Sequence, residues 1–266
     1  MDEIASPFIL ATPPWGNLKL QPSKDGVVVV DNKQVRISEL KQVLVGEVAY
    51  VLGATQKSFN RLCECIDVQR LDFYQMRVAD VSALHAIPRL NHLALRCNTK
   101  VENIDVLPRL HLATLILEGT PKIANLEPLS ACNNLVHLTY SGGYGFANYA
   151  DSLEPISQIK NLQELVLQNL RVGSDGLMPL AGCLTLKELV ISNQFSTEEF
   201  AMLSVRLSNV RCDMFQSYIS IKYPRIDGAD VMIVGKRKPR LNSITDFEKI
   251  ASFDRAFTVL QESFRH

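Results

Sequence analysis

The sequence predicts a curved α/β solenoid in which each short repeat contributes one strand to a parallel sheet. The first observation is an apolar pattern, L-x-x-L-x-L, at Leu90, Leu93 and Leu95, which recurs 22 residues later from Leu112. The second is that the pattern continues along the chain in steps of 21 to 27 residues. A nearly fixed period in this range is typical of solenoids, in which each turn buries its apolar residues only against its neighbours.

The composition allows a large core and gives the chain no bulk charge preference. Of its 266 residues 47% are hydrophobic, and 28 basic residues balance 28 acidic ones. With zero net charge, binding to nucleic acid or to an anionic membrane is not expected. The sequence has no apolar run near the roughly 20 residues that span a bilayer, and its acidic N-terminus is unlike a signal peptide, so we expect a cytoplasmic protein.

No motif in the sequence predicts catalysis, a metal or a cofactor. The phosphate-binding, zinc-protease, dithiol and nucleophile-elbow motifs G-x-x-x-x-G-K-[ST], H-E-x-x-H, C-x-x-C and G-x-S-x-G are all absent. Six cysteines are scattered along the chain, and Cys63 and Cys65 have no second pair to complete a zinc site. We expect reduced, mostly buried thiols.

The first 44 residues do not repeat, and we expect them to cap the first turn with short strands. Gly26 leads into an apolar run at 27–30, and an alternating run follows at 35–37 after Asp31 and Asn32. An atypical segment at the end of a solenoid shields the apolar face of the terminal repeat.

Residues 45–215 are predicted to form seven or eight repeats. On each strand the fourth and sixth pattern positions face the core, and the third, fifth and seventh face outward. Between strands, apolar clusters that end in proline predict short 3₁₀ or α-helical turns on the convex side. A capping box at Ser196 and Glu199 predicts one longer helix near the end. The first positions of the pattern are Val45, Val68, Leu90, Leu112, Leu135, Leu162, Leu186 and, most weakly, Leu207.

Residues 216–266 are predicted to cap the other end of the solenoid. Two strands are expected at 219–223 and 230–234, followed by a basic turn at 235–240 and a helix that begins near Ser243. The apolar residues expected on one face of this helix are Phe247, Ile250, Phe257 and Leu260.

These turns resemble the leucine-rich-repeat superfamily over about residues 45–215, in particular the short class found in bacterial internalins and in a regulatory subunit of protein phosphatase 1. The resemblance implies a horseshoe with its parallel sheet on the concave face, protein recognition there or at its rims, and no catalytic residues. The superfamily usually places asparagine three residues after the last strand leucine, where its amide ties successive loops together. Only Asn98 fits, so we expect this ladder to be broken or replaced. The other turns have different residues at this position: Gly53, Met76, Thr120, Gly143, Leu170, Gln194 and Phe215.

The outward strand positions are the first candidate site for a partner protein. Their charge runs from mixed-basic to acidic along the sheet, and electrostatic complementarity would favour a partner there. The alternative is that they are ordinary solvated strand residues, with some exposed Ile and Val. His92 and His137 are expected roughly 10 Å apart, too far to share a metal ion. The candidates are Arg70, Asp72, Tyr74, His92, Arg96, Glu118, His137, Glu164 and Glu188.

An insertion in the 27-residue repeat is the second candidate site. Residues 141–151 place Tyr144, Phe146 and Tyr149 among glycines at the edge of the solenoid. Loops carry binding function more often than a scaffold does, and aromatic side chains supply large contact areas. The same side chains could instead fold back to fill the gap that the insertion leaves. Both interpretations stay open.

The sequence therefore predicts a non-catalytic, bacterial protein-interaction module. A toxin-neutralising protein and a regulatory or scaffolding subunit are two settings that it does not separate. A rival hypothesis is an enzyme or a nucleotide-binding protein with a site in the end caps, where Lys236 or Arg237 would contact a phosphate. The partner and the oligomeric state are not encoded in any motif.

Overall fold

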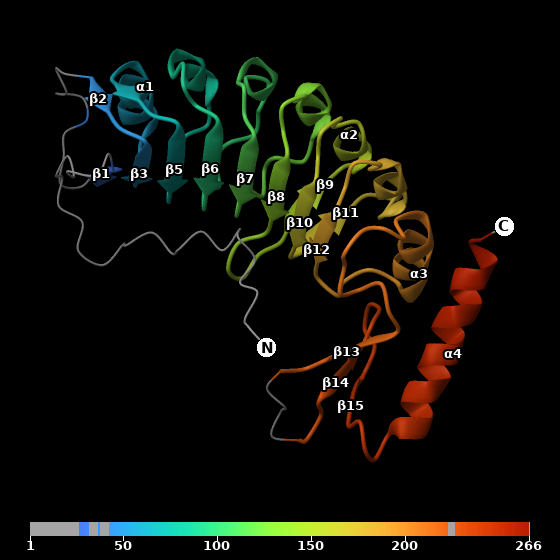
Figure 1. Cartoon of the computed structure of the whole chain (residues 1–266). Helices are drawn as coiled ribbons and strands as arrows, with labels where there is room; N and C mark the ends of the chain where they lie inside the picture. The colour runs from blue at the N-terminus through green and yellow to red at the C-terminus, as the bar shows by residue number, and fades with distance from the viewer. Residues whose placement is uncertain (1–26, 32–36, 38–42, 223–226, 266) are drawn as a thin grey trace.

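The protein is an arc-shaped solenoid with an eight-stranded parallel sheet on its inner side and helical turns on its outer side (Figure 1). The structure is a computed structural model that describes residues 27–31, 37, 43–222 and 227–265. It confirms the predicted curved solenoid with a parallel sheet on its concave face and short helical turns on its convex face. The strands of the sheet follow one another in chain order: β1 (Val27–Asp31), β3 (Val48–Leu52), β5 (Arg70–Tyr74), β6 (His92–Arg96), β7 (Thr114–Glu118), β8 (His137–Ser141), β10 (Glu164–Gln168) and β12 (Glu188–Ile191).

The repeat spacing sets the register of the sheet. Leu93 pairs with Leu115 and Leu95 with Leu117, so residues 22 positions apart lie side by side on adjacent strands. Each such side chain gains about 1.5–3 kcal/mol from burial. The buried fourth and sixth positions form one continuous core: Leu71, Phe73, Leu93, Leu95, Leu115, Leu117, Leu138, Tyr140, Leu165, Leu167, Leu189 and Ile191.

The first predicted repeat is wrong by one residue. A pattern that starts at Val45 turns Val48 and Tyr50 toward the core, whereas Val45 is exposed and the buried residues of β3 are Ala49 and Val51. All five residues of β3 are apolar or aromatic, so the pattern fits either register and cannot choose between them. Pairing with the neighbouring strand decides the register.

The sheet is also shifted along the chain relative to the prediction. β1, which lies in the region expected to form a cap, pairs in parallel with β3 and is the first strand. The other strand predicted there, at 35–37, lies almost entirely outside the described residues. At the opposite end Leu207 does not start an eighth turn, because it is the C-cap residue of helix α3 (Thr197–Arg206).

The convex side carries the expected short helical turns and one helix that the sequence did not predict. The capping box of α3 is confirmed, with Ser196 and Glu199 capping each other's backbone. The unpredicted helix is α1 (Gln56–Glu64), whose N-terminus is capped by Thr55 and Ser58. The short turns are 3₁₀ helices at Ser82–Ala86, Leu107–Arg109, Glu127–Ala131 and Met178–Gly182, together with α2 (Glu154–Ser157).

Two fully buried asparagines tie successive loops together. Asn98 is fully buried, and its Nδ2 donates to the carbonyl of Val78 at 3.0 Å. Asn148, also fully buried, accepts a hydrogen bond from the backbone N–H of Thr120 at 3.1 Å. Asn148, and not Gly143, therefore occupies the asparagine position of its repeat, and the insertion comprises residues 143–147.

Two short strand pairs flank the main sheet, one after the carboxyl ends of its strands and one before their amino ends. Asn148 belongs to β9 (Asn148–Ala150), which pairs in parallel with β11 (Leu170–Val172). β2 (Leu44–Val45) pairs in the same way with β4 (Ile66–Asp67). These pairs continue the stacking of the repeats beyond the main strands.

The C-terminal region contains three antiparallel strands and a helix that packs against α3 (Figure 1). The strands are β13 (Tyr218–Ser220), β14 (Val231–Ile233) and β15 (Arg240–Leu241), of which the third was not predicted. None of the described helices is long and apolar enough to cross a membrane.

The last helix, α4 (Phe247–Ser263), buries the predicted face except at its first residue, and Leu260 packs partly buried against the core. Ile250 and Phe257 are buried, as expected, but Phe247 is 62% exposed. Instead of Phe247, Phe253 packs on a second, smaller hydrophobic core that includes residues of β14 and β15. The Lys238 ammonium lies 5.4 Å from the centre of the Phe253 ring.

Candidate functional site

Three rows of side chains cross the concave face, because the strands pair in register. The amino-end row lies at the start of the strands: Arg70, His92, Thr114, His137, Glu164 and Glu188. The central row lies between the other two: Asp72, Ala94, Ile116, Thr139, Val166 and Val190. The carboxyl-end row lies at the end of the strands: Tyr74, Arg96, Glu118, Ser141 and Gln168.

The central row is more buried than the sequence predicted. Asp72 and Ile116 are each 2% exposed, so the prediction of an exposed Ile and of an accessible carboxylate at these positions is wrong. On the inside of a curved sheet the side chains of neighbouring strands converge, and the longer ones in the outer rows cover the centre. Val166 and Val190 are only half-buried. The accessible part of the central row therefore begins after β7.

Arg96 joins three adjacent strands through two carboxylates. Its Nε donates to Asp72 Oδ2 at 3.2 Å, and its Nη1 donates to Glu118 Oε2. Burial raises the pKa of Asp72, and the adjacent Arg96 opposes this shift. Asp72 Oδ1 is buried without a hydrogen-bond partner in the described part of the chain. With both acids ionised, the cluster carries one net negative charge.

The two histidines of the amino-end row are separated by Thr114 and have different surroundings. Burial, together with the cations Arg70 and Arg96, lowers the pKa of His92 to about 3, so this ring is neutral at pH 7. His137 Nδ1 lies 3.5 Å from Glu164 Oε2. Among the described residues, no group of three or more His, Cys, Asp or Glu side chains is arranged to hold a metal ion.

A cavity of ≈ 410 Å³, which we call the concave groove, lies over the second half of the sheet. Ile116, Val166 and Val190 supply its apolar floor. Ser141 on its rim is 6% exposed, and its Oγ has no hydrogen-bond partner among the described residues. An apolar centre with a polar rim is the usual anatomy of a protein interface. The polar residues around the floor are Arg96, Glu118, Thr139, Ser141, Gln168 and Asn169.

The inserted loop borders the groove and divides its aromatic residues between two roles. The ring of Phe146 lies against Gly143, where a Cβ atom would stand 2.5 Å from the ring. Asn169 Nδ2 fixes the loop by donating to the carbonyls of Gly143 at 3.0 Å and Phe146 at 2.7 Å. Tyr144 at the tip is fully exposed, and Tyr149 is 43% exposed. Phe146 thus folds back, while the two tyrosines face solvent.

Of the predicted concave candidates, the groove contains only Arg96 and Glu118. The other predicted residues lie on β5 or in the amino-end row. The groove residues that sequence reasoning did not select carry no charge and no aromatic ring, since charge and aromatic character guided the selection. Their outward strand positions were the available signal: Ile116, Thr139, Ser141, Val166, Gln168 and Val190.

The end-cap site of the rival hypothesis lies beside a helix N-terminus that is capped by an acidic side chain. Lys236 and Lys238 line a cavity of ≈ 320 Å³ beside the N-terminus of α3. There the carboxylate of Glu199 accepts hydrogen bonds from the N–H and Oγ of Ser196 and from the N–H of Leu177. The N–H of Ser196 is thus already bonded to a carboxylate, and of the two cations in the hypothesis only Lys236 lines the cavity.

Comparison with known proteins gives structural similarities only. No family model and no curated protein matches the chain. Internalin C2 from Listeria monocytogenes strain 4b F2365 is similar at 23% identity and TM-score 0.44, over 60% of this chain and 65% of its own. An internalin, inlF, from the same strain is similar at 18% identity and TM-score 0.48, over 70% of this chain and 59% of its own. The plant peptide hormone receptor RGFR1 in complex with RGF2 is similar at 12% identity and TM-score 0.37, over 71% of this chain and 33% of its own. The chain thus spans less than two thirds of each of these structures.

Proposed function

We propose that the protein binds another protein through the concave groove and the adjacent exposed loop. The observation that carries this proposal is the accessible apolar surface of Val166 and Val190, next to the buried Ile116, inside a polar rim. Parallel sheets are normally covered on both faces, so accessible apolar side chains on this sheet form a surface that a partner would stabilise by burying it.

The rim of the groove offers fixed polar groups for specificity. Arg96 is only 17% exposed and is held in one orientation by its two carboxylates, so little conformational entropy is lost when a partner contacts it. Ser141 Oγ has no hydrogen-bond partner among the described residues, and leaving a buried polar atom unpaired costs about 1–3 kcal/mol. A hydroxyl can donate or accept, so a partner that offers either kind of hydrogen bond there would be preferred over one that offers neither.

Tyr144 extends this surface at the loop tip. Its side chain is fully exposed, whereas the loop beneath it is held by Phe146 and Asn169. A tyrosine presented on a fixed loop provides a large contact area at a low entropic cost. We expect it to contact the part of the partner that lies outside the groove.

The biological setting that we propose is a cytoplasmic, non-catalytic one, either neutralisation of a toxin or regulation of another protein. All six cysteines are free thiols, as is usual in a reducing compartment. A toxin-neutralising protein would bind one partner with nanomolar or lower Kd, and a regulatory subunit would bind with micromolar Kd. Titration calorimetry with the captured partner separates the two.

Affinity capture from native lysate with matched variants tests the site. Thr139→Arg places a long cation in the centre of the groove, and Gln158→Arg places the same side chain on the convex surface at the end of α2. We expect one protein to be retained by the wild type and by Gln158→Arg and to be lost with Thr139→Arg. Far-ultraviolet circular dichroism checks that both variants are folded. Retention by all three proteins would show that the groove is not the site.

A further inference from the structure

The outer edge of β12 is paired at only one place in the described part of the chain. An isolated parallel bridge joins Glu188 to Arg211. Around it, the N–H of Leu189 donates to the carbonyl of Arg211 at 2.9 Å, and the N–H of Arg211 donates to the carbonyl of Lys187 at 2.8 Å. After Arg211 the chain enters a series of turns. The second half of β12 is therefore left without a neighbouring strand.

Two backbone groups of β12 point toward this open edge. In a parallel strand successive residues direct their N–H and C=O groups to alternate sides. The N–H of Ser192 donates inward, to Leu167 on β10, and that of Leu189 donates outward. Ile191 therefore directs its N–H outward, and Leu189 directs its carbonyl the same way. Neither group has a backbone partner among the described residues.

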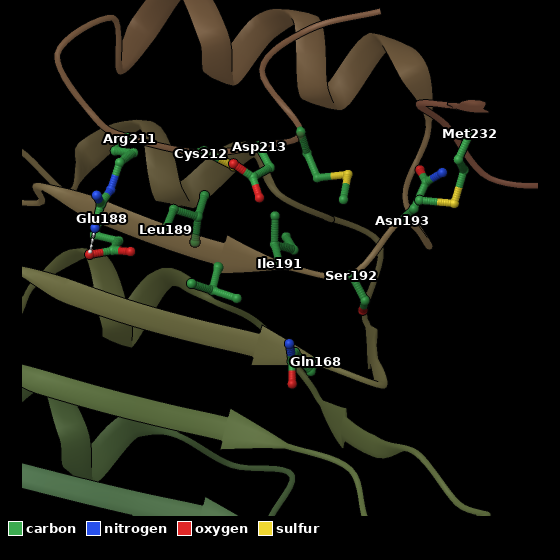
Figure 2. A pocket seen from close by; sticks show the side chains of 12 residues that line it. Gln168, Glu188, Leu189, Ile191, Ser192, Asn193, Arg211, Cys212, Asp213 and Met232 are labelled. Carbon is green, nitrogen blue, oxygen red and sulfur yellow. Dashed lines mark hydrogen bonds and ion pairs between the residues drawn. The ribbon is translucent and has the colours of Figure 1, made fainter. Parts of the chain in front are cut away.

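A cavity of ≈ 560 Å³, which we call the edge cleft, lies along this open edge (Figure 2). Its walls are β12, the segment 211–214 and Met232 of β14. Met214 and Met232 supply apolar surface, and methionine side chains adapt readily to an incoming group. The edge cleft is separate from the concave groove, although Gln168 and Val190 line both.

The charge of the edge cleft favours a cation. Glu188 and Arg211 neutralise each other across 2.6 Å at one end of the cleft. Asp213 is exposed, and its carboxylate points into the cleft between Arg211 and the methionine wall (Figure 2). No residue in the described part of the chain forms an ion pair with Asp213. One negative charge is therefore left for a ligand to neutralise.

We propose that the edge cleft binds an extended segment of a partner protein, which adds to β12 as a further strand and carries a basic side chain. Its backbone pairs with the N–H of Ile191 and the C=O of Leu189, which is how strands are added to open sheet edges. Its lysine or arginine pairs with Asp213, and an adjacent apolar side chain lies against Met214 and Met232. A second copy of this chain would meet the cleft with another recessed edge, whereas a single projecting segment can enter it.

A synthetic peptide tests the proposal on the full-length protein. The probe is an acetylated and amidated hexapeptide in which valine alternates with lysine. One control peptide has glutamate in place of lysine, and another has every backbone nitrogen methylated, so that it cannot donate a backbone hydrogen bond to either side. We expect only the first to bind, as measured by chemical-shift changes in the isotope-labelled protein. Equal binding of the N-methylated peptide, or no binding of the probe at millimolar concentration, would overturn the proposal.

Two variants and one amide make the test specific to the cleft. Asp213→Lys should weaken binding of the basic peptide by about tenfold or more, because an ion pair is replaced by a repulsion. Glu262→Lys, on the exposed surface of α4, makes the same charge change elsewhere and should leave binding unchanged. The amide of Ile191 should exchange rapidly in the free protein and slowly with bound peptide. Protection of Ile191 that rises with protein concentration alone would assign the edge to a second copy and reject the proposal.

Discussion

Single residues on the concave face determine both how the repeats hold together and how they respond to pH. Arg96 bridges carboxylates on the strands before and after its own, so it couples three repeats that otherwise contact only their neighbours. Removing one member of such a half-buried cluster leaves an uncompensated charge, which costs more than the net contribution of the pair itself. Asp72, at 2% exposure, is the member with least access to water.

His92 gives the protein a specific sensitivity to acid. Its pKa of about 3 lies below the usual 6.5, so the unfolded chain binds a proton first as the pH falls. The stabilisation from the neutral ring is present above pH 6.5 and is lost as the pH falls from there toward 3. We expect His92→Gln to lose less stability than the wild type over this range, as measured by urea unfolding at pH 7, 5 and 4.

The control for this prediction is His111→Gln, which changes an exposed histidine. It should follow the wild-type pH dependence. If His92→Gln and the wild type lose the same stability between pH 7 and 4, His92 does not titrate in the way its burial implies.

At the scale of elements, the inserted loop is an addition to a repeat that is complete without it. Gly142 and Ala147 lie next to each other at the base of the loop, and a Cβ atom on Gly142 would stand 2.8 Å from the Cα of Ala147. Removing residues 143–147 shortens the step from His137 to Glu164 from 27 to 22 residues, which is the spacing from β5 to β6 and from β6 to β7. Asn148 would then follow Gly142 directly and would still occupy the asparagine position of the repeat.

We therefore expect a variant lacking residues 143–147 to fold with its sheet intact. Its free energy of unfolding should stay within about 1 kcal/mol of the wild type, because loop length alone has a small effect on stability. Urea unfolding followed by circular dichroism measures this, and Tyr144→Ser is the control for loss of the exposed side chain alone. A variant that does not fold would show that the loop is a structural part of the repeat.

The strands were largely predictable from the sequence because their leucines alternate with other residue types. From Leu71 to Ile191 all the predicted core positions are buried, although some outward positions such as Asp72 and Ile116 are buried too. The prediction was wrong where the local pattern is ambiguous. β3 is apolar on both faces, and Leu207 ends a helix whose periodicity resembles the start of a repeat. α1 was missed because its capping box has Ser58 where a longer Glu or Gln is usual.

The binding site was only partly predictable, because a cavity depends on side-chain sizes across strands. Sequence alternation identifies the outward positions, but it does not show that Ile116 is covered while Val166 and Val190 are accessible. No sequence pattern predicts the edge cleft. It exists because the chain turns away from β12 after a single bridge at Arg211.

At the scale of the whole molecule, the solenoid should lose stability locally rather than all at once. Phe257 on α4 is 3% exposed and belongs to the main core at the C-terminal end. Phe257→Ala should reduce stability there by about 3–5 kcal/mol. Because each repeat contacts only its neighbours, amides of α3 and β12 should lose protection in hydrogen exchange while those of β5 and β6 keep it.

Phe247→Ala is the matched control on the same helix, because Phe247 is 62% exposed. It should leave the exchange pattern unchanged. A uniform loss of protection over all strands in Phe257→Ala would mean that the described molecule unfolds as one cooperative unit.

The stacking of the strands along the arc also determines how the molecule resists mechanical force. Tension between the two ends acts perpendicular to the strands, so the hydrogen bonds between adjacent repeats break one repeat at a time. Each released repeat of 22 residues adds up to about 75 Å of chain, and the repeat with the insertion, at 27 residues, adds about 92 Å. Because of the five inserted residues, this repeat gives a longer extension step than the others. The position of that step in a force–extension trace shows how many repeats have already unfolded.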